Sequence, residues 1–174
     1  MRRNRKWVQI AILIAILLIG GYTIGSSLFA EESIPREGSE PPAFSLLGLD
    51  GKTYSLQDYK GRPVIVNFWG TWCDPCKREM PAIQSQYEKW KDRGLEVLAL
   101  NLDESRVTVQ SFVQQNGLTF PILFDKDLHM RDRYAVRSYP TTFFIDSSGK
   151  IAKIAPGEMT EAFIEQTVRT ILKE

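Results

Sequence analysis

Residues 66–81 read VNFWGTWCDPCKREMP, and this stretch joins two different patterns of side chains. The run PVIVNFW at 63–69 is rich in β-branched and aromatic residues, which is typical of a central strand covered on both faces. From Asp74 to about residue 91, apolar residues instead recur at three- and four-residue spacings, which predicts a helix. The pair Cys73 and Cys76 therefore lies where a strand ends and a helix begins.

The spacing of the two cysteines favours dithiol chemistry at that junction. Free backbone N–H groups and the positive end of the helix dipole stabilise a thiolate in the first turn, so Cys73 is predicted to be the nucleophile. Cys76 follows one helical turn later, within bridging reach, and is predicted to resolve the mixed disulfide. Pro75 suits the first turn because its φ is already helical and no amide donor is needed there. We therefore predict a catalytic pair that forms a redox-active disulfide.

Composition argues against several other classes of protein. The chain has 174 residues, 43% of them hydrophobic, which suits one folded domain with one sizeable core. Its net charge is +1 and no basic run follows the first few residues, so nucleic acid is not an expected partner. Two thiols and a single histidine, His129, are too few for a structural zinc site. We expect no metal and no other cofactor.

The first thirty residues favour an anchor over a part of the folded domain. Residues 7–29 carry no charge, and a helix of this length, at about 1.5 Å per residue, crosses a hydrocarbon core of about 30 Å. Basic residues gather within 1–6, which places that end in the cytoplasm and the domain outside. A cleaved secretory signal is the alternative, and it would export the domain equally. The expected division is a cytoplasmic 1–6, a transmembrane signal-anchor at 7–29, a linker at 30–38 and the domain at 39–174.

The remaining patterns predict a mixed α/β sheet. The pair Asp50-Gly51 suits the positive φ angles of a tight turn, so a small hairpin is expected at the start of the domain. The expected strands are 43–49, 53–56, 63–69, 95–102, 141–146 and 150–155, and the expected helices are 74–91, 107–116, 127–134 and 160–172. This order of elements implies a central sheet with helices on both faces.

Two features outside the dithiol are further candidates for a substrate surface. Trp72, beside Cys73, is placed to form a contact surface for an extended peptide. Tyr139-Pro140 precedes the strand at 141–146, and a cis bond there would present a backbone edge beside the dithiol. The trans form is the general default for X-Pro bonds, so the residues alone leave this alternative open.

Glu79 has two interpretations. It lies one helical turn after Cys76, where partial burial would raise the pKa of its carboxyl towards neutrality and allow proton exchange with the sulfur. The alternative is a solvated helix glutamate paired with Lys77 or Arg78. The residues alone do not separate these interpretations.

The strings VNFWGTWCDPCKREMP and SYPTTFFID, the order of elements and the N-terminal span resemble the thioredoxin-like proteins of cytochrome c maturation, in particular the ResA family. The resemblance covers about 39–173 and implies a thioredoxin-like fold with an added N-terminal β-hairpin. It also implies that Pro140 is cis and faces the active site, with Tyr139 beside it at the substrate-binding surface. In that family a carboxylate at the position of Glu79 acts in proton handling and substrate recognition.

The resemblance implies a protein-disulfide reductase with a particular substrate and donor. Members of this family reduce the disulfide in the C-x-x-C-H haem-attachment segment of apocytochrome c, and they receive electrons from a membrane protein such as CcdA. The dithiol by itself predicts only exchange with some partner disulfide. Other envelope or spore-cortex proteins are therefore alternative substrates.

Two rival activities are weaker. A copper-binding chaperone on the same scaffold would use a C-x-x-x-C spacing, one residue longer than here, and a later histidine, whereas His129 sits in a charged helical stretch. Peroxide reduction is disfavoured because peroxiredoxin-like sites place a threonine three residues before the reactive cysteine. Gly70 holds that place in this chain.

Overall fold

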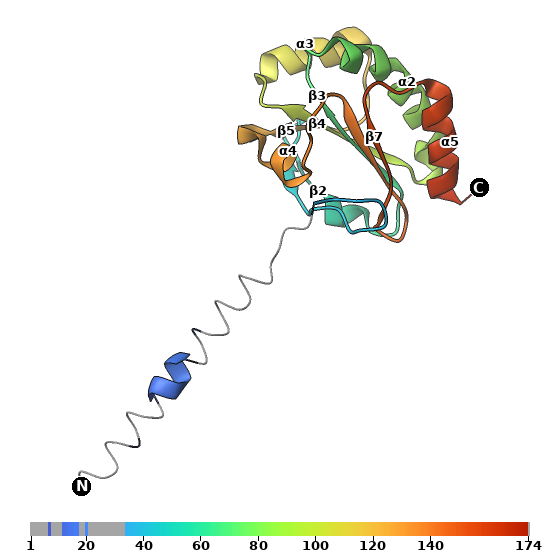
Figure 1. Ribbon diagram of the computed structural model, residues 1–174. Coiled ribbons are helices and arrows are strands. Elements are labelled where there is room, and N and C mark those ends of the chain that lie inside the picture. Colours follow the sequence, from blue (N-terminus) through green and yellow to red (C-terminus); the bar gives the residue numbers. More distant parts are fainter. Residues whose placement is uncertain (1–6, 8–11, 18–19, 21–33, 174) are drawn as a thin grey trace. The chain divides into compact units, whose positions relative to one another are not determined.

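The computed structural model describes residues 34–173 and, before them, residues 7, 12–17 and 20 (Figure 1). The chain divides into two units, Met1–Ser33 and Ile34–Glu174. Residues 12–17 of the first unit are helical. No helix in the described part of the chain has the length and apolar character needed to span a bilayer.

Several predictions for the N-terminal region fall outside the described residues. The segment 1–6 is not described, and most of the predicted span at 7–29 is not described either. The first four residues of the predicted linker at 30–38 also lie outside the described residues. The anchor therefore stays a prediction.

A mixed sheet forms the centre of the second unit. Within the described residues its order is β5-β4-β3-β6-β7, with β3, β4 and β5 parallel and with β6 antiparallel to both β3 and β7. The strands are β3 (Val64–Trp69), β4 (Glu96–Leu102), β5 (Ile122–Asp125), β6 (Thr141–Ile145) and β7 (Ile151–Pro156), and a separate antiparallel pair is β1 (Ser45–Leu47) with β2 (Thr53–Ser55).

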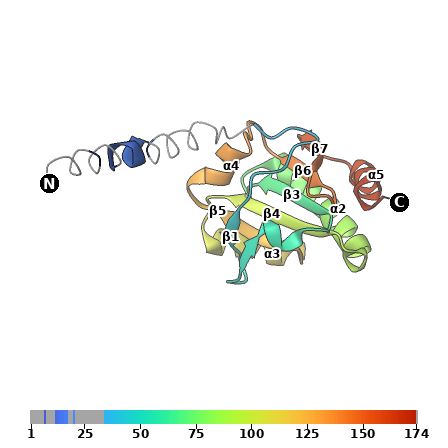
Figure 2. The same cartoon turned by 90° about the horizontal axis from the view of Figure 1, so that it is seen from below.

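Helices cover both faces of this sheet, as the sequence predicts. They are η1 (Leu56–Tyr59), α2 (Asp74–Trp90), η2 (Lys91–Arg93), α3 (Arg106–Asn116), η3 (Lys126–Leu128), α4 (His129–Arg133) and α5 (Glu161–Leu172). Ile65 and Trp69 of β3 pack in one hydrophobic cluster with α2, α3 and α5, whereas Val66 and Phe68 pack in a second cluster with η1 and α4. Figure 2 shows α3 and α4 on opposite sides of the sheet.

The central strand β3 positions the dithiol. All its side chains are buried, because β4 and β6 pair with its two sides and helices cover both faces. It ends at Trp69 and α2 begins at Asp74, so the cysteines lie at the carboxyl end of the parallel strands, where ligands and active sites gather in α/β folds. Thr141 pairs with Phe68, and the start of β6 therefore lies at this same end.

The N-terminal part of the domain lies along both outer strands. The predicted hairpin is present as β1 and β2, with Gly51 at φ 85° in its turn, and beyond β1 the Leu49 N–H donates to the carbonyl of Ile122 in β5 at 2.8 Å. On the opposite side of the sheet, the Gly38 N–H donates to the Ile151 carbonyl in β7 at 2.7 Å.

The sequence prediction omitted one strand. β5 is only four residues long and follows directly after Pro121, so its pattern is too short to be separated from a loop.

The predicted helix at 127–134 is also wrong in part. Asp127 and Leu128 adopt left-handed φ angles of 58° and 57°, and α4 begins only at His129. The carboxylate of Asp125 accepts the N–H groups of Met130 and Arg131, each at 2.8 Å. This side-chain cap holds the start of the short helix.

Candidate active site

The two cysteines open α2 and are joined as a disulfide. Their sulfur atoms lie 2.08 Å apart. Cys73 is the N-cap residue, with extended φ and ψ of −95° and 104°, and its Sγ accepts the N–H of Cys76 at 3.3 Å. Pro75 occupies the first turn, where no amide donor is needed. The predicted bridge and the predicted strand–dithiol–helix order are both present.

Both cysteines are buried, and Cys73 retains slightly more exposed surface than Cys76. Cys76 is fully buried, whereas the exposed fraction of Cys73 is 6%. The free N–H groups and positive dipole of the seventeen-residue α2 act at its first turn. These groups are the ones expected to stabilise a thiolate at Cys73 after reduction, so the role of Cys73 as nucleophile stays a prediction.

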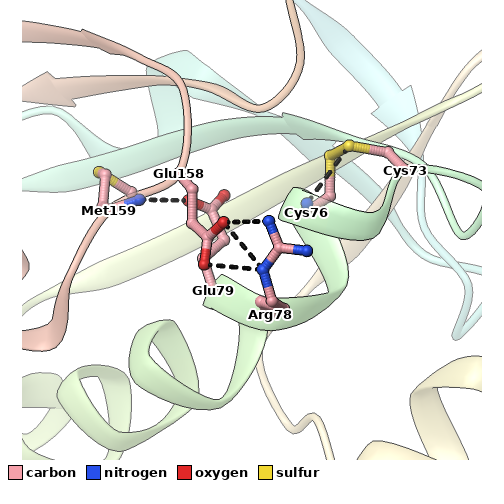
Figure 3. A network of polar contacts seen from close by, with 6 residues as sticks. All are labelled: Cys73, Cys76, Arg78, Glu79, Glu158 and Met159. Carbon is pink, nitrogen blue, oxygen red and sulfur yellow. Dashed lines mark hydrogen bonds and ion pairs between the residues drawn. A yellow bond between two sulfur atoms is a disulfide. The ribbon is translucent and has the colours of Figure 1, made fainter.

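Glu79 is buried one turn further along the same helix (Figure 3). Its exposed fraction is 1%; its Oε1 accepts from Asn67 Nδ2 at 2.9 Å, and its Oε2 accepts the Met159 N–H at 3.1 Å. The interpretation of Glu79 as a surface glutamate paired with Lys77 or Arg78 is wrong. Those two side chains pair with Asp74 and Glu158 instead, each at 2.5 Å.

The surroundings of Glu79 shift the pKa of its carboxyl towards neutral pH. Burial raises the pKa of Glu79 to about 7, and the nearby charge of Glu158 acts in the same direction. The hydrogen bonds from Met159 and Asn67 lower this pKa and so limit the rise. A carboxyl with this pKa both accepts and releases a proton near neutral pH.

The loop before β6 lies at the same end of the sheet. The Tyr139–Pro140 peptide bond is cis, as the family resemblance implies. Tyr139 packs edge-on against Trp72, with ring centroids 5.5 Å apart and an interplanar angle of 85°. Trp72 remains 57% exposed, whereas Trp69 is fully buried in the core. The structure thus brings Trp72, Tyr139 and Pro140 together beside the cysteines.

Sequence reasoning missed two polar groups around the dithiol. Asn67 is a buried amide in the middle of the apolar run of β3, and that interruption was the available signal. Glu104, after β4, holds the loop that leads to the cysteines: its carboxylate accepts the Thr71 N–H at 2.7 Å, the Thr71 hydroxyl and the Asn101 side-chain amide at 2.7 Å. Nothing in the spacing of Glu104 and Thr71 indicated this contact.

Metal ligands do not gather at the dithiol. Across the part of the chain that the structure describes, no three His, Cys, Asp or Glu residues are grouped so that they could hold a metal ion. His129 begins α4 and lines a pocket with Leu47 and Phe124, none of which belongs to the dithiol site.

The fold and the site define a class of protein. A C-x-x-C disulfide at the start of a helix, following the central strand of a mixed sheet and facing a cis-proline loop, defines a thioredoxin-like thiol-disulfide oxidoreductase. A profile described as the AhpC/TSA family matches residues 38–154.

Comparison with known proteins narrows this class. The chain is 41% identical over 173 residues to the thiol-disulfide oxidoreductase ResA of Halalkalibacterium halodurans, covering 99% of this chain and 98% of the relative. It is 39% identical over 170 residues to ResA of Bacillus subtilis, covering 98% and 95%. Among solved structures, StoA of Bacillus subtilis matches with a TM-score of 0.65 and 30% identity, covering 74% of this chain and 97% of that one. The chain belongs to the ResA thiol-disulfide oxidoreductases within the AhpC/TSA family.

Proposed function

We propose that this thiol-disulfide oxidoreductase is anchored in the cell membrane and reduces the haem-attachment disulfide of apocytochrome c on the extracytoplasmic side. The observation that carries the proposal is the pairing of the Cys73–Cys76 disulfide with a buried carboxyl, Glu79, whose pKa is about 7. The likeness to the ResA proteins over nearly the whole chain supports it. The uncharged run at 7–29, preceded by basic residues, supports the anchor and its orientation.

The proposed reaction proceeds in two exchanges. The Cys73 thiolate attacks one sulfur of the substrate disulfide, the substrate S–S bond breaks, and the released substrate thiolate takes a proton from solvent. Cys76 then gives its proton to Glu79 and attacks Cys73, forming the Cys73–Cys76 disulfide. The second substrate sulfur leaves as a thiolate and receives that proton. Two electrons pass from the enzyme dithiol to the substrate, which leaves as a dithiol.

The next turnover requires a new supply of two electrons. We propose a membrane dithiol donor of the CcdA kind, which would reduce the Cys73–Cys76 disulfide by the same exchange in reverse. The exposed Trp72, together with Tyr139 and Pro140, supplies the surface on which an extended partner segment binds beside Cys73.

Trapping the mixed disulfide tests the proposed substrate. The full-length Cys76→Ala variant should accumulate apocytochrome c on Cys73, because the resolving thiol is missing. The matched control carries Cys73→Ala in addition and should trap nothing. Capture of other envelope proteins without apocytochrome c, and normal c-type cytochrome levels in a strain lacking this protein, would overturn the substrate assignment.

A second candidate is a reductant for other envelope or spore-cortex proteins. The structural likeness to StoA supports this second hypothesis, because StoA has a similar fold but is a separately named protein. The same trap separates the two candidates by the identity of the captured protein.

A further inference from the structure

Asn67 holds an unusual position at the centre of the sheet. Its side chain is fully buried, and its Nδ2 donates both to Glu79 Oε1 and to Thr142 Oγ1, each at 2.9 Å. Asn67 and Thr142 are register partners on β3 and β6, so the backbone fixes their spacing. Among the described residues, Asn67 Oδ1 has no hydrogen-bond partner. Such an atom in a buried site calls for a functional explanation.

The hydrogen-bonding capacity of these groups links the amide to the proton on Glu79. An ionised carboxylate offers only acceptors, so the Asn67 NH₂ group must face it. A protonated carboxyl carries one O–H, and the Met159 N–H keeps Oε2 as an acceptor, which leaves the proton on Oε1. There the proton would face the Asn67 NH₂ group, donor against donor. Turning the amide by 180° instead places Oδ1 between two donors, the Glu79 O–H and the Thr142 hydroxyl.

We propose that Asn67 is a positioning residue for Glu79, and that its side-chain amide turns over whenever the Glu79 carboxyl gains or loses a proton. In each orientation one end of the amide faces Glu79 and Thr142, and the other end has no hydrogen-bond partner that would hold it in place. The amide is therefore able to turn when the protonation of Glu79 changes. The amide thereby keeps the carboxyl hydrogen-bonded in both states. This inference rests on the proposed role of Glu79 as proton acceptor for Cys76.

The charges around Glu79 are compatible with this exchange. Burial raises the pKa of Glu79 to about 7, so both protonation states are populated near neutral pH. The charged group that acts on it from the loop between β7 and α5 is Glu158, whose carboxylate is itself paired with Arg78 on α2. In the disulfide form, Cys73 and Cys76 do not titrate.

A pH titration by NMR tests the coupling. The full-length protein is kept in mild detergent as the disulfide form, and the Glu79 carboxyl carbon and the Asn67 side-chain NH₂ signals are followed together. We expect the two sets of signals to titrate with one midpoint, near pH 7. NH₂ signals that stay constant through the Glu79 midpoint would overturn the proposal. The wild-type titration does not depend on the folding of any variant.

Three variants sharpen this test. Glu79→Gln should fix the amide in its turned orientation at every pH, because the new side-chain NH₂ needs an acceptor. An Asn67 NH₂ group that still contacts Thr142, as it does in the wild type with Glu79 ionised, would overturn the proposal. Asn67→Leu should raise the Glu79 midpoint by about one to two pH units, because a donor to the carboxylate is lost. Asn101→Leu removes an equally buried amide from β4 and should leave that midpoint unchanged.

The outcome is independent of the physiological substrate, because the titration contains none. Coupled titration in a protein that traps no apocytochrome c would refute the proposed substrate and leave the role of Asn67 intact. An uncoupled amide in a protein that does trap apocytochrome c would refute the role of Asn67 alone.

Discussion

Two strand-to-helix junctions stand side by side in this sheet, and they cap their helices with different atoms. After β4, Ser105 Oγ accepts the Thr108 N–H at 3.2 Å; after β3, Cys73 Sγ accepts the Cys76 N–H at 3.3 Å. A hydroxyl is a favoured N-cap, whereas a thiol sulfur is a weak acceptor. The junction after β3 thus lacks a good N-cap and instead places a reactive sulfur at the positive end of a helix.

The two junctions also differ in the second turn of their helices. The sixth residue after the cap is the buried Glu79 in α2 and the exposed Ser111 in α3. The junctions are nevertheless connected, because Glu104 of the junction after β4 binds Thr71 of the junction after β3. One junction supports the geometry of the other, and only one carries chemistry.

The largest effect is expected from exchanging the capping atoms. Cys73→Ser should abolish reduction of a disulfide-bonded C-x-x-C-H peptide, because a hydroxyl does not attack sulfur at a useful rate, while the helix keeps a good cap. Ser105→Cys, made in the Cys73→Ser background, should restore no turnover, because no resolving cysteine follows it. Stopped-flow assays of peptide reduction check both, and residual turnover in either variant would contradict the distinction between the junctions.

Glu79, the buried acid in the junction after β3, should make the free energy of unfolding depend on pH. The pKa of Glu79 is raised from its ordinary 4.5 to about 7 in the folded state, so folding takes up a proton between these values. Its contribution is full below about pH 4.5 and is lost as pH rises through 7, by about 3 kcal/mol at most. Urea denaturation of the disulfide form across this range measures it.

Glu79→Gln provides the control for this pH dependence. The variant cannot titrate at this position, so its free energy of unfolding should lack that part of the decline between pH 4.5 and 7. An identical decline in the variant and the wild type would show that Glu79 is not its source.

Breaking the connection between the junctions should have a smaller effect. Glu104→Ala leaves the Thr71 N–H and the Asn101 amide without their acceptor, and should cost about 2 kcal/mol of unfolding free energy. Thr71→Val removes only the hydroxyl contact and should cost about 1 kcal/mol. Equal losses in the two variants, measured by urea denaturation, would argue against a central role for the Glu104 carboxylate.

The smallest effect is expected at the ordinary cap. Ser105→Ala removes the acceptor for the Thr108 N–H and should destabilise the protein by about 1 kcal/mol. Reduction of the peptide should be unchanged, since α3 carries none of the reacting groups. The change in turnover can be expressed as a change in activation free energy. If this exceeds the loss of unfolding free energy, the two junctions are coupled more tightly than their contacts suggest.

Local patterns predicted the parts of the fold that depend on local sequence. The apolar run of β3, the helical spacing in α2 and the turn at Asp50-Gly51 each give a clear signal, and the structure confirms them. β5 was missed because its four residues carry no readable period. The helix at α4 was drawn too long because two left-handed residues interrupt it, and a side-chain cap from Asp125 then sets its start.

The site was predictable where neighbouring residues build it. Cys73, Cys76 and Pro75 lie within one helical turn, so their spacing and their place after the β3 run predicted the disulfide that the structure shows. Glu79 accepts a hydrogen bond from the N–H of Met159, which is 80 positions away, and its contact with Asn67 depends on how α2 packs on β3. Such long-range contacts leave no periodic trace in the sequence.

The residues that lead into the domain have a consequence for solubility. An outer strand with unpaired N–H and C=O groups is a template on which other chains can aggregate. Here β7 is lined by Gly38 and by Glu37, whose carboxylate accepts the Ile154 N–H at 3.1 Å, and β5 is lined by the segment around Leu49. A polypeptide that reaches the cysteines therefore finds little open strand edge on either side of this sheet with which to pair.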